Sequence, residues 1–176
     1  MSQDSHKQEA ARAALNHILP DLNPRSILGV GTGSTVNYLI DALAEEKDQF
    51  EGAIASSEAT AERLKQHGIP VYDLNAVAPP RFYLDGADEA NKRLELVKGG
   101  GGAHAREKVV AHQAERFVVV VDPTKEVDRL GDQFPVPVEV LPMAATPVMH
   151  TLEDMGATPE LRLSERKDGP VVTDQG

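Results

Sequence analysis

The fold class of this chain is decided by residues 26–35, which read SILGVGTGST. Residues 26–30 form a short apolar run typical of a strand, and the run passes into a turn that contains Gly31 and Gly33. Beyond the turn, apolar side chains recur at the spacing of one helical face, at Val36, Leu39, Ile40 and Leu43. The stretch therefore predicts a strand, a glycine turn and a helix in direct succession.

The same alternation of strands and helices extends on both sides of this unit. A helix is expected over residues 5–18, because prolines follow it. Another is expected from Ser57, a capping residue, to about Gly68, and a third over residues 104–114. The expected strands cover residues 52–56, 70–74, 81–84 and 117–121, the last being a continuous apolar run that suits a strand buried on both faces. This order predicts an α/β fold with a mostly parallel, Rossmann-like sheet and helices on both faces.

The pattern changes after Val121, where prolines become frequent. Residues 136–140 alternate like a strand with one exposed face, and a helix follows that ends at Gly156. Leu161 and Leu163 alternate again, and residues 171–173 read as a last strand. The order strand, helix, strand, strand predicts a small α+β domain.

We therefore expect two domains, a catalytic α/β domain over residues 1–126 and the smaller domain over 127–176. The last expected strand runs into the turn residues 174–176, and no partner strand follows them. The pattern ends in the middle of a hairpin, so it predicts that the natural protein is longer than this sequence.

Composition excludes several classes of function. The chain of 176 residues has no cysteine, which excludes disulfides, thiolate metal sites and a cysteine nucleophile. Its net charge is −10 and it has no basic run, so a nucleic-acid partner is not expected. No apolar run approaches the roughly 20 residues of a membrane span, and the polar start is no signal peptide. A cytoplasmic protein without a membrane partner is expected.

The GTGST loop, residues 31–35, is typical of an anion site. Its glycines let a ligand approach the backbone, and the free N–H groups at the start of a helix favour a negative charge. A dinucleotide fingerprint would need a third glycine, but its position holds Ser34 or Val36, depending on the starting glycine. A small phosphate fits better. The alternative is a plain turn in which Ser34 only caps the helix.

Two further glycine-containing motifs follow. Residues 85–89 read DGADE and come just after an expected strand, where open α/β sheets place their ligands. Their carboxylates repel one another, which can raise a pKa, and they could hold a metal or sugar hydroxyls; the alternative is a solvated acidic turn. Residues 98–102 read KGGGG, a loop that could follow a ligand closely while Lys98 stabilises an oxyanion, or else a flexible linker.

The remaining candidates are single side chains. Glu107 lies between two cations and would by itself be a surface residue, but its closeness to the glycine loop could direct it into the same pocket. Lys125, in the DPTK segment, follows an expected strand and could reach a phosphate or remain exposed. The histidines lack metal-binding spacing, so no metal is expected, and a solvent-facing role is expected for His104.

Four motifs in this order, GTGST, DGADE, KGGGG followed by AHAREK, and DPTK, resemble the type A ribose-5-phosphate isomerases. The resemblance covers essentially the whole chain, and residues 134–140 resemble the first strand of that family's small, ferredoxin-like lid domain. The family usually continues for several tens of residues, and the absence of such a tail here would affect lid closure, activity and dimer formation.

The resemblance implies an aldose–ketose isomerase that interconverts ribose 5-phosphate and ribulose 5-phosphate in the non-oxidative pentose phosphate pathway. It implies an enediolate, no metal or other cofactor, and a homodimer. By resemblance Glu107 is the general base, Lys98 stabilises the enediolate, Asp85 shuttles a proton in ring opening and Asp88 orients hydroxyls. The implied substrate-binding residues are Thr32, Gly33, Ser34, Thr35, Asp85, Gly86, Ala87, Asp88, Lys98, Gly99, Gly100, Gly101 and Lys125.

Two rival classes remain open. One is another reaction on a related fold, such as an amino-sugar phosphate deaminase or an acyl-CoA transferase, although DGADE and KGGGG together argue against both. The other is a non-catalytic sugar-phosphate sensor, which would use the GTGST loop and Lys125 but would not need Glu107.

Overall fold

A computed structural model of the chain describes residues 2–164 and 168–175. Residues 26–35 form the predicted unit, with strand β1 (Ile27–Val30) leading through the glycine turn into helix α2 (Ser34–Glu45). Gly33 is the residue before the helix and has a φ of 117°, a left-handed conformation that favours glycine. Because this position is a glycine, Ser34 is not the cap that the alternative interpretation required.

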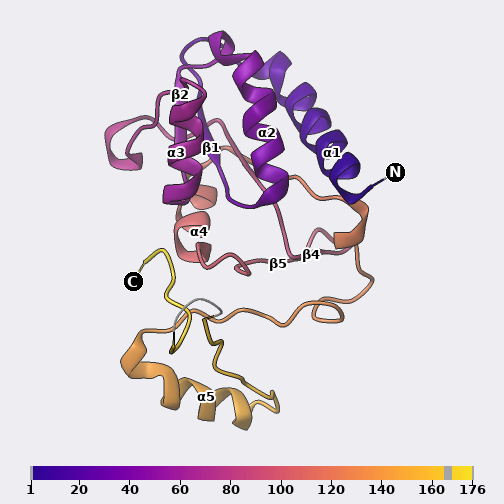
Figure 1. The fold of residues 1–176 in the computed structure, drawn as a ribbon, viewed down its shortest axis with the longest axis vertical. Helices are drawn as coiled ribbons and strands as arrows, with labels where there is room; N and C mark the ends of the chain where they lie inside the picture. The colour runs from indigo at the N-terminus through magenta and orange to yellow at the C-terminus, as the bar shows by residue number, and fades with distance from the viewer. Residues whose placement is uncertain (1, 165–167, 176) are drawn as a thin grey trace.

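A parallel sheet of four strands lies among the helices in the upper part of the molecule as drawn in Figure 1. Its order is β2 (Gly52–Ala55), β1, β3 (Phe82–Asp85) and β6 (Arg116–Val119). All three pairings are parallel, and all four residues of both β1 and β3 are buried. The predicted α/β fold with a mostly parallel sheet is confirmed.

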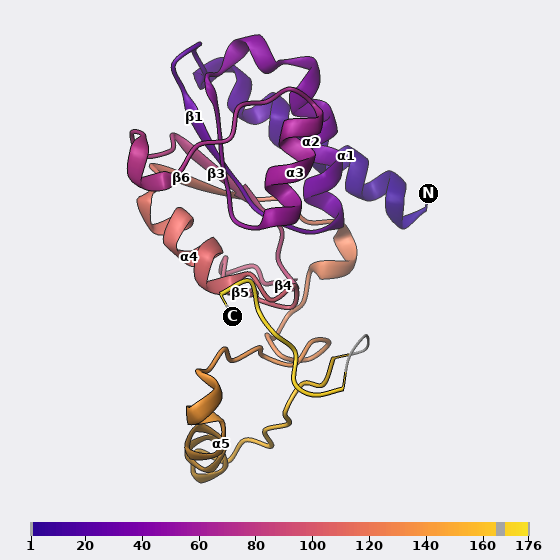
Figure 2. The ribbon, with the colours of Figure 1, turned by 60° about the vertical axis from the view of Figure 1, so that its left-hand side comes forward.

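Helices cover both faces of the sheet, as Figure 2 shows. On one face α1 (Gln3–Ile18), α2 and α3 (Glu58–Gln66) share a core with β1 and β3. On the other face Val110 of α4 (His104–Gln113) packs against Tyr83 of β3. Two serines cap helices: the side chain of Ser2 accepts a hydrogen bond from the amide of Ser5, and that of Ser57 accepts one from the amide of Thr60, as expected.

The chain also contains short elements. Two of them are the strands of an antiparallel hairpin, β4 (Glu89–Ala90) and β5 (Leu96–Val97). The others are the 3₁₀ turns η1 (Leu19–Asp21), η2 (Lys47–Gln49), η3 (Leu74–Ala76), η4 (Pro123–Lys125) and η5 (Pro142–Ala144).

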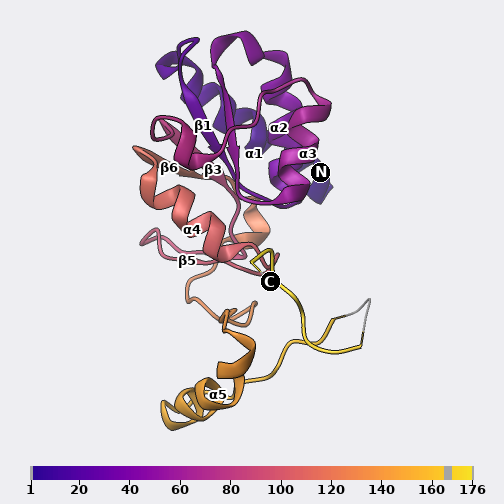
Figure 3. The same cartoon turned by 90° about the vertical axis from the view of Figure 1, so that its left-hand side faces the viewer.

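The chain from residue 127 onward has a different character. Its described part contains one α-helix, α5 (Ala145–Asp154), which lies apart from the sheet (Figure 1). Several of its large apolar side chains are exposed, among them Leu141 and Met143. Figure 3 shows the end of the chain returning toward α4 and β5, and the amide of Asp174 donates to Gly102 O there.

Several predicted strands are absent or different in the described chain. Residues 70–74 contribute only a single bridge from Val71 to Ala53, followed by η3. The strand expected at 117–121 is the edge strand β6, and Phe117 is 37% exposed, so it is not buried on both faces. An edge strand has a neighbour on one side only, which its apolar composition does not reveal.

The strands expected in the smaller domain are also missing from the described residues. Residues 136–140 and 171–173 run as irregular chain, and Leu163 forms an isolated bridge with Pro170. Alternating apolar residues become a strand only when another strand accepts their backbone hydrogen bonds. The end of the expected last turn, Gly176, lies outside the described residues. Among the helices that the structure describes, none has the length and apolar character needed to cross a membrane.

Candidate active site

A cleft of about 200 Å³ opens beside the carboxyl ends of the central strands β1 and β3. This edge of a parallel sheet is where α/β folds bind ligands, because loops and helix N-termini converge there. The lining residues are Thr32, Gly33, Ser34, Thr35, Val36, Gly86, Ala87, Asp88, Lys98, Gly99, Gly100, Gly101, Glu107 and Lys125. The structure thus brings all four sequence motifs together in one cleft.

Asp85 lies beneath the cleft at the end of β3 and holds two loops together. Its Oδ1 accepts hydrogen bonds from the amides of Thr32, at 3.1 Å, and Gly86, at 2.8 Å. A methyl group on Gly31 would come within 1.9 Å of the same oxygen, so this position requires a glycine. The GTGST loop is therefore fastened to the DGADE segment by a fully buried carboxylate.

The other oxygen of Asp85 belongs to a cluster of buried charges. Lys98 Nζ lies 2.7 Å from Asp85 Oδ2 and 2.6 Å from Gly86 O, and it lies 3.2 Å from Glu107 Oε2. The side chains of Lys98, Asp85 and Glu107 are 12%, 0% and 5% exposed. Opposite charges at these distances stabilise one another strongly because little water screens them.

Tyr83 also belongs to this cluster, because it contacts Asp85. Its hydroxyl donates to Asp85 Oδ2 at 2.6 Å, and its ring packs against Phe117. Burial, together with the negative charge of Asp85, raises the pKa of Tyr83 far above its ordinary value, so the phenol stays protonated. Asp85 therefore accepts from four donors and is held in one position.

Glu107 differs from Asp85 because fewer groups hold its carboxylate. Burial raises the pKa of Glu107, the nearby charge of Asp85 raises it further, and Lys98 opposes both. Oε2 receives the Lys98 ion pair but no hydrogen bond from the residues that the structure describes. A carboxylate that lines a cleft and has a raised pKa can accept and return a proton.

His104 also faces Glu107, although 39% of its side chain is exposed to solvent as expected. Its Nδ1 is buried and lies 3.7 Å from Glu107 Oε2, one turn earlier on α4. The sequence offered a signal in the i, i+3 spacing of the two residues, which places them on one helix face. Glu107 itself is buried, so the surface interpretation of this residue is wrong.

The glycine loop forms one wall of the cleft. Gly99 and Gly102 have φ values of 108° and 80°, which a side chain would strain. The amide of Gly100 donates to Asp88 Oδ2 at 2.8 Å, and Arg162 donates to Gly100 O at 2.7 Å. The loop is thus tied to its surroundings on both sides and does not serve as a free linker.

Lys125 is positioned by the turn in which it lies. Asp122 caps η4 through the amide and hydroxyl of Thr124. Burial would raise the pKa of Asp122, but these hydrogen bonds and the nearby Lys125 lower it, so the cap is a carboxylate. Lys125 is thereby held at the cleft, which residues 32–36 also line.

The three carboxylates of the DGADE segment do not face one another as the repulsion argument assumed. Asp85 points to Lys98, and Asp88 points to Gly100 N. Glu89 points away, to the backbone of residues 131–134, and its pKa is lowered rather than raised. In the part of the chain that the structure describes, no group of three or more His, Asp or Glu side chains could hold a metal ion.

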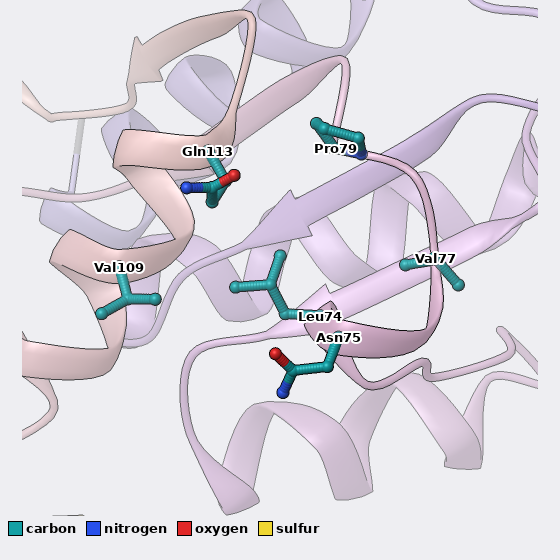
Figure 4. A pocket seen from close by; sticks show the side chains of 6 residues that line it. All are labelled: Leu74, Asn75, Val77, Pro79, Val109 and Gln113. Carbon is teal, nitrogen blue, oxygen red and sulfur yellow. The ribbon is translucent and has the colours of Figure 1, made fainter.

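A second hollow, of about 340 Å³, lies between η3 and α4 (Figure 4). Its lining contains no charged side chain. The residues are Leu74, Asn75, Val77, Pro79, Val109 and Gln113. With no acid, base or anion-binding group, this larger hollow is not suited to chemistry on a phosphorylated substrate.

Comparison with known proteins places the chain in a family. Residues 52–176 match the family described as "Ribose 5-phosphate isomerase A (phosphoriboisomerase A)". A structure of D-ribose-5-phosphate isomerase in complex with phospho-erythronic acid is 36% identical, with a TM-score of 0.92, and the match covers 100% of this chain and 77% of that one.

Two further solved structures agree. Ribose 5-phosphate isomerase A from Methanocaldococcus jannaschii is 37% identical, with a TM-score of 0.91, and the match covers 99% of this chain and 77% of that one. The enzyme from Neisseria gonorrhoeae is 40% identical, with a TM-score of 0.84 and coverage of 95% and 74%. This chain belongs to the ribose 5-phosphate isomerase A family, and the predicted class of aldose–ketose isomerase is confirmed.

Proposed function

We propose that this chain interconverts D-ribose 5-phosphate and D-ribulose 5-phosphate through an enediolate, as a step of the non-oxidative pentose phosphate pathway. The observation that carries the proposal is the pair formed by Glu107 and Lys98 at the cleft, 3.2 Å apart and both largely buried. Aldose–ketose isomerisation moves one proton between neighbouring carbons and moves negative charge onto an oxygen, so it needs one base and one cation.

Glu107 is the proposed base. Ionised Glu107 removes the proton from C2 of the open-chain aldose and delivers it to C1, while the C1 oxygen gains and the C2 hydroxyl loses a proton. Its raised pKa makes the carboxylate a better base than an exposed glutamate. This feature favours an enzyme over a non-catalytic sensor, which would have no use for a buried carboxylate with a raised pKa at the cleft.

Lys98 is the proposed electrostatic stabiliser of the enediolate. The Asp85 carboxylate and Gly86 O hold its ammonium group in place, so little reorganisation accompanies the appearance of charge on the substrate. Since Asp85 accepts four hydrogen bonds, we propose that it orients Lys98, with proton transfer in ring opening as its second role.

The phosphate is proposed to bind at the start of α2. The glycine turn there exposes backbone N–H groups, with Ser34, Thr35 and Lys125 on the same cleft. The sugar then extends along Ala87 and Asp88 toward the glycine loop. A relative's structure contains phospho-erythronic acid, whose planar carboxylate resembles the two oxygens of an enediolate, and this supports the proposed intermediate.

The proposal is tested by incubating the 176-residue chain with ribose 5-phosphate in D₂O with a chelator present. Nuclear magnetic resonance then follows ribulose 5-phosphate and its deuterium content. We expect turnover with some deuterium at C1, because a proton held on Glu107 can exchange with solvent. Absence of turnover by the folded chain would contradict the proposed activity, and complete retention of the substrate hydrogen would favour a hydride shift over an enediolate.

A further inference from the structure

Glu89, the last residue of the DGADE segment, is a buried carboxylate that the proposed mechanism does not use. It is 1% exposed and begins the short strand β4. Its Oε2 accepts from the amide of Gly131 at 2.5 Å, and its Oε1 accepts from the amides of Gln133 and Phe134 at 2.6 and 2.8 Å. One side chain thus satisfies three backbone donors of a turn more than forty residues away in the sequence.

The charge of Glu89 is part of this arrangement. Burial by itself would raise the pKa of Glu89, but the three amide donors, with help from Lys125, lower it below the ordinary glutamate value. Hydrogen bonds to an ionised acceptor are about twice as strong as neutral ones. The carboxylate therefore acts as a charged anchor for residues 131–134.

The anchored turn leads directly onto the glycine loop of the cleft. A methyl group on Gly100 would lie 2.8 Å from the Phe134 ring, and one on Gly99 would lie 3.3 Å from Pro137. Gly100 is also the residue whose amide donates to Asp88. Residues 131–137 therefore pack against the loop next to Asp88, the neighbour of Glu89, which accepts from the Gly100 amide.

We propose that Glu89 is a positioning residue for this site: it fastens residues 131–134 so that Phe134 keeps the glycine loop in its substrate-binding conformation. The proposal rests on the proposed function, because it takes the glycine loop to bind the sugar. Glu89 does not touch the cleft, so it acts through Phe134 and Gly100 and not on the reacting atoms.

This role predicts a particular kinetic effect. Lys98 and Glu107 are held by contacts that do not involve residues 131–134. A loosened glycine loop therefore weakens binding of substrate and transition state equally, which raises KM and leaves kcat nearly unchanged. A purely structural role would instead lower stability or the yield of folded protein without changing KM.

The test compares Glu89→Gln and Glu89→Ala with the control Glu95→Gln. Glu95 lies on the same β4–β5 hairpin, is half exposed and bonds to Asn91 and Arg93, not to the turn. We expect KM for ribose 5-phosphate to rise at least about tenfold in Glu89→Ala, since buried amides lose their acceptor, and less in Glu89→Gln, which keeps one oxygen. The control should match the unaltered chain. Equal KM values in all four proteins would overturn the proposal.

Amide hydrogen exchange separates this inference from the proposed function. In Glu89→Ala we expect faster exchange at the three anchored amides and also at Gly100, with unchanged exchange in β1 and β3. Hydrogen exchange does not require turnover, so it tests the role of Glu89 even if the chain does not isomerise ribose 5-phosphate. Faster exchange at residues 131–134 with an unchanged Gly100 would show that the anchor does not reach the glycine loop and would overturn the proposal.

Discussion

Residues 2–126 of this chain are held in place by other forces than residues 127–164 and 168–175. In the first region apolar side chains from three helices and the sheet form a continuous core. In the described part of the second region, Leu141, Met143 and Met155 remain largely exposed, and the chain is attached by hydrogen bonds. Burial of apolar surface is roughly proportional to area, so the first region supplies most of the folding free energy.

The attachments of the second region are not spread over the surface. They converge on the glycine loop and on the segment after β3: Arg162 reaches Gly100, Asp174 reaches Gly102, and the turn at 131–134 reaches Glu89. The two regions therefore meet at the cleft. From this we infer that changes in the first region act on stability, whereas changes at the junction act on the cleft.

The largest effect is expected at Glu107. Glu107→Gln removes the proposed base while preserving its shape, so kcat should fall about a thousandfold. Its free energy of unfolding should not fall, because a buried carboxylate with a raised pKa does not favour folding at neutral pH. Steady-state kinetics and urea unfolding measure the two quantities. The exposed Glu115, substituted in the same way, is the control; normal kcat in Glu107→Gln would remove Glu107 from the mechanism.

The difference in packing between the two regions is tested by replacing one leucine with alanine in each. Leu39→Ala, in the core of α2, should lower the free energy of unfolding by about 3 kcal/mol. Leu141→Ala, at a side chain that is 71% exposed, should change it by less than about 0.5 kcal/mol. Urea denaturation of both variants provides the comparison. Similar losses in the two would show that the second region is packed as tightly as the first.

A substitution at the junction of loop and sheet should have an intermediate effect. Gly31→Ala places a methyl group against Asp85, so the GTGST loop must move, at a cost of about 2 kcal/mol of stability. Activity should fall as well, because Asp85 also holds Lys98. Gly131→Ala is a useful contrast: that residue has open space but a φ of 85°, so its cost comes from backbone strain alone.

The smallest effect is the pH dependence of two buried carboxylates. The pKa of Glu107 is raised from 4.5, so kcat/KM should rise with pH over a limb that lies above 4.5, as the base ionises. The stability contributed by protonated Glu107 is present below 4.5 and is lost as pH rises through the raised value. Unfolding of wild type and Glu107→Gln at several pH values should therefore diverge as the pH rises. A limb at or below 4.5 would contradict this assignment.

Glu89 is the counterpart, because its pKa is lowered. Its contribution to stability is present above the ordinary glutamate pKa and is lost only as pH falls through the lower folded value. The anchor at 131–134 should therefore stay intact over the whole range in which Glu107 titrates.

Much of the first region could be predicted because its signals are local. The helices at 3–18, 34–45 and 104–113 and the strands β1 and β2 follow from apolar periodicity, caps and glycines within a few residues. The strand expected at 70–74 failed because one bridge to Ala53 is all the pairing available there. The division at residue 126/127, the lid, the homodimer and the cytoplasmic location stay predictions.

In the candidate active site, too, features with local signals could be predicted and contacts made by folding could not. The residues of its four motifs could be selected from the sequence, because glycine turns and charged residues after strands are recognisable locally. Glu89 could not be assigned its contacts, because only folding brings the turn at 131–134 near it, whereas Tyr83 and His104 lie within three residues of the carboxylates that they contact. The charged neighbours of Glu107 in the sequence indicated a surface residue, and only the structure shows that Glu107 is buried.

The sequence by itself determined the α/β class, the glycine turn before α2 and the residues able to do acid–base and electrostatic work, because these depend on backbone freedom and side-chain chemistry at neighbouring positions. Only the tertiary structure decided how the carboxylates divide their tasks. Asp85 is saturated by four donors, Glu107 is paired with Lys98 and has a raised pKa, and Glu89 is ionised against backbone amides. Their chemistry is the same, and the difference arises from burial and from the partners that distant segments supply.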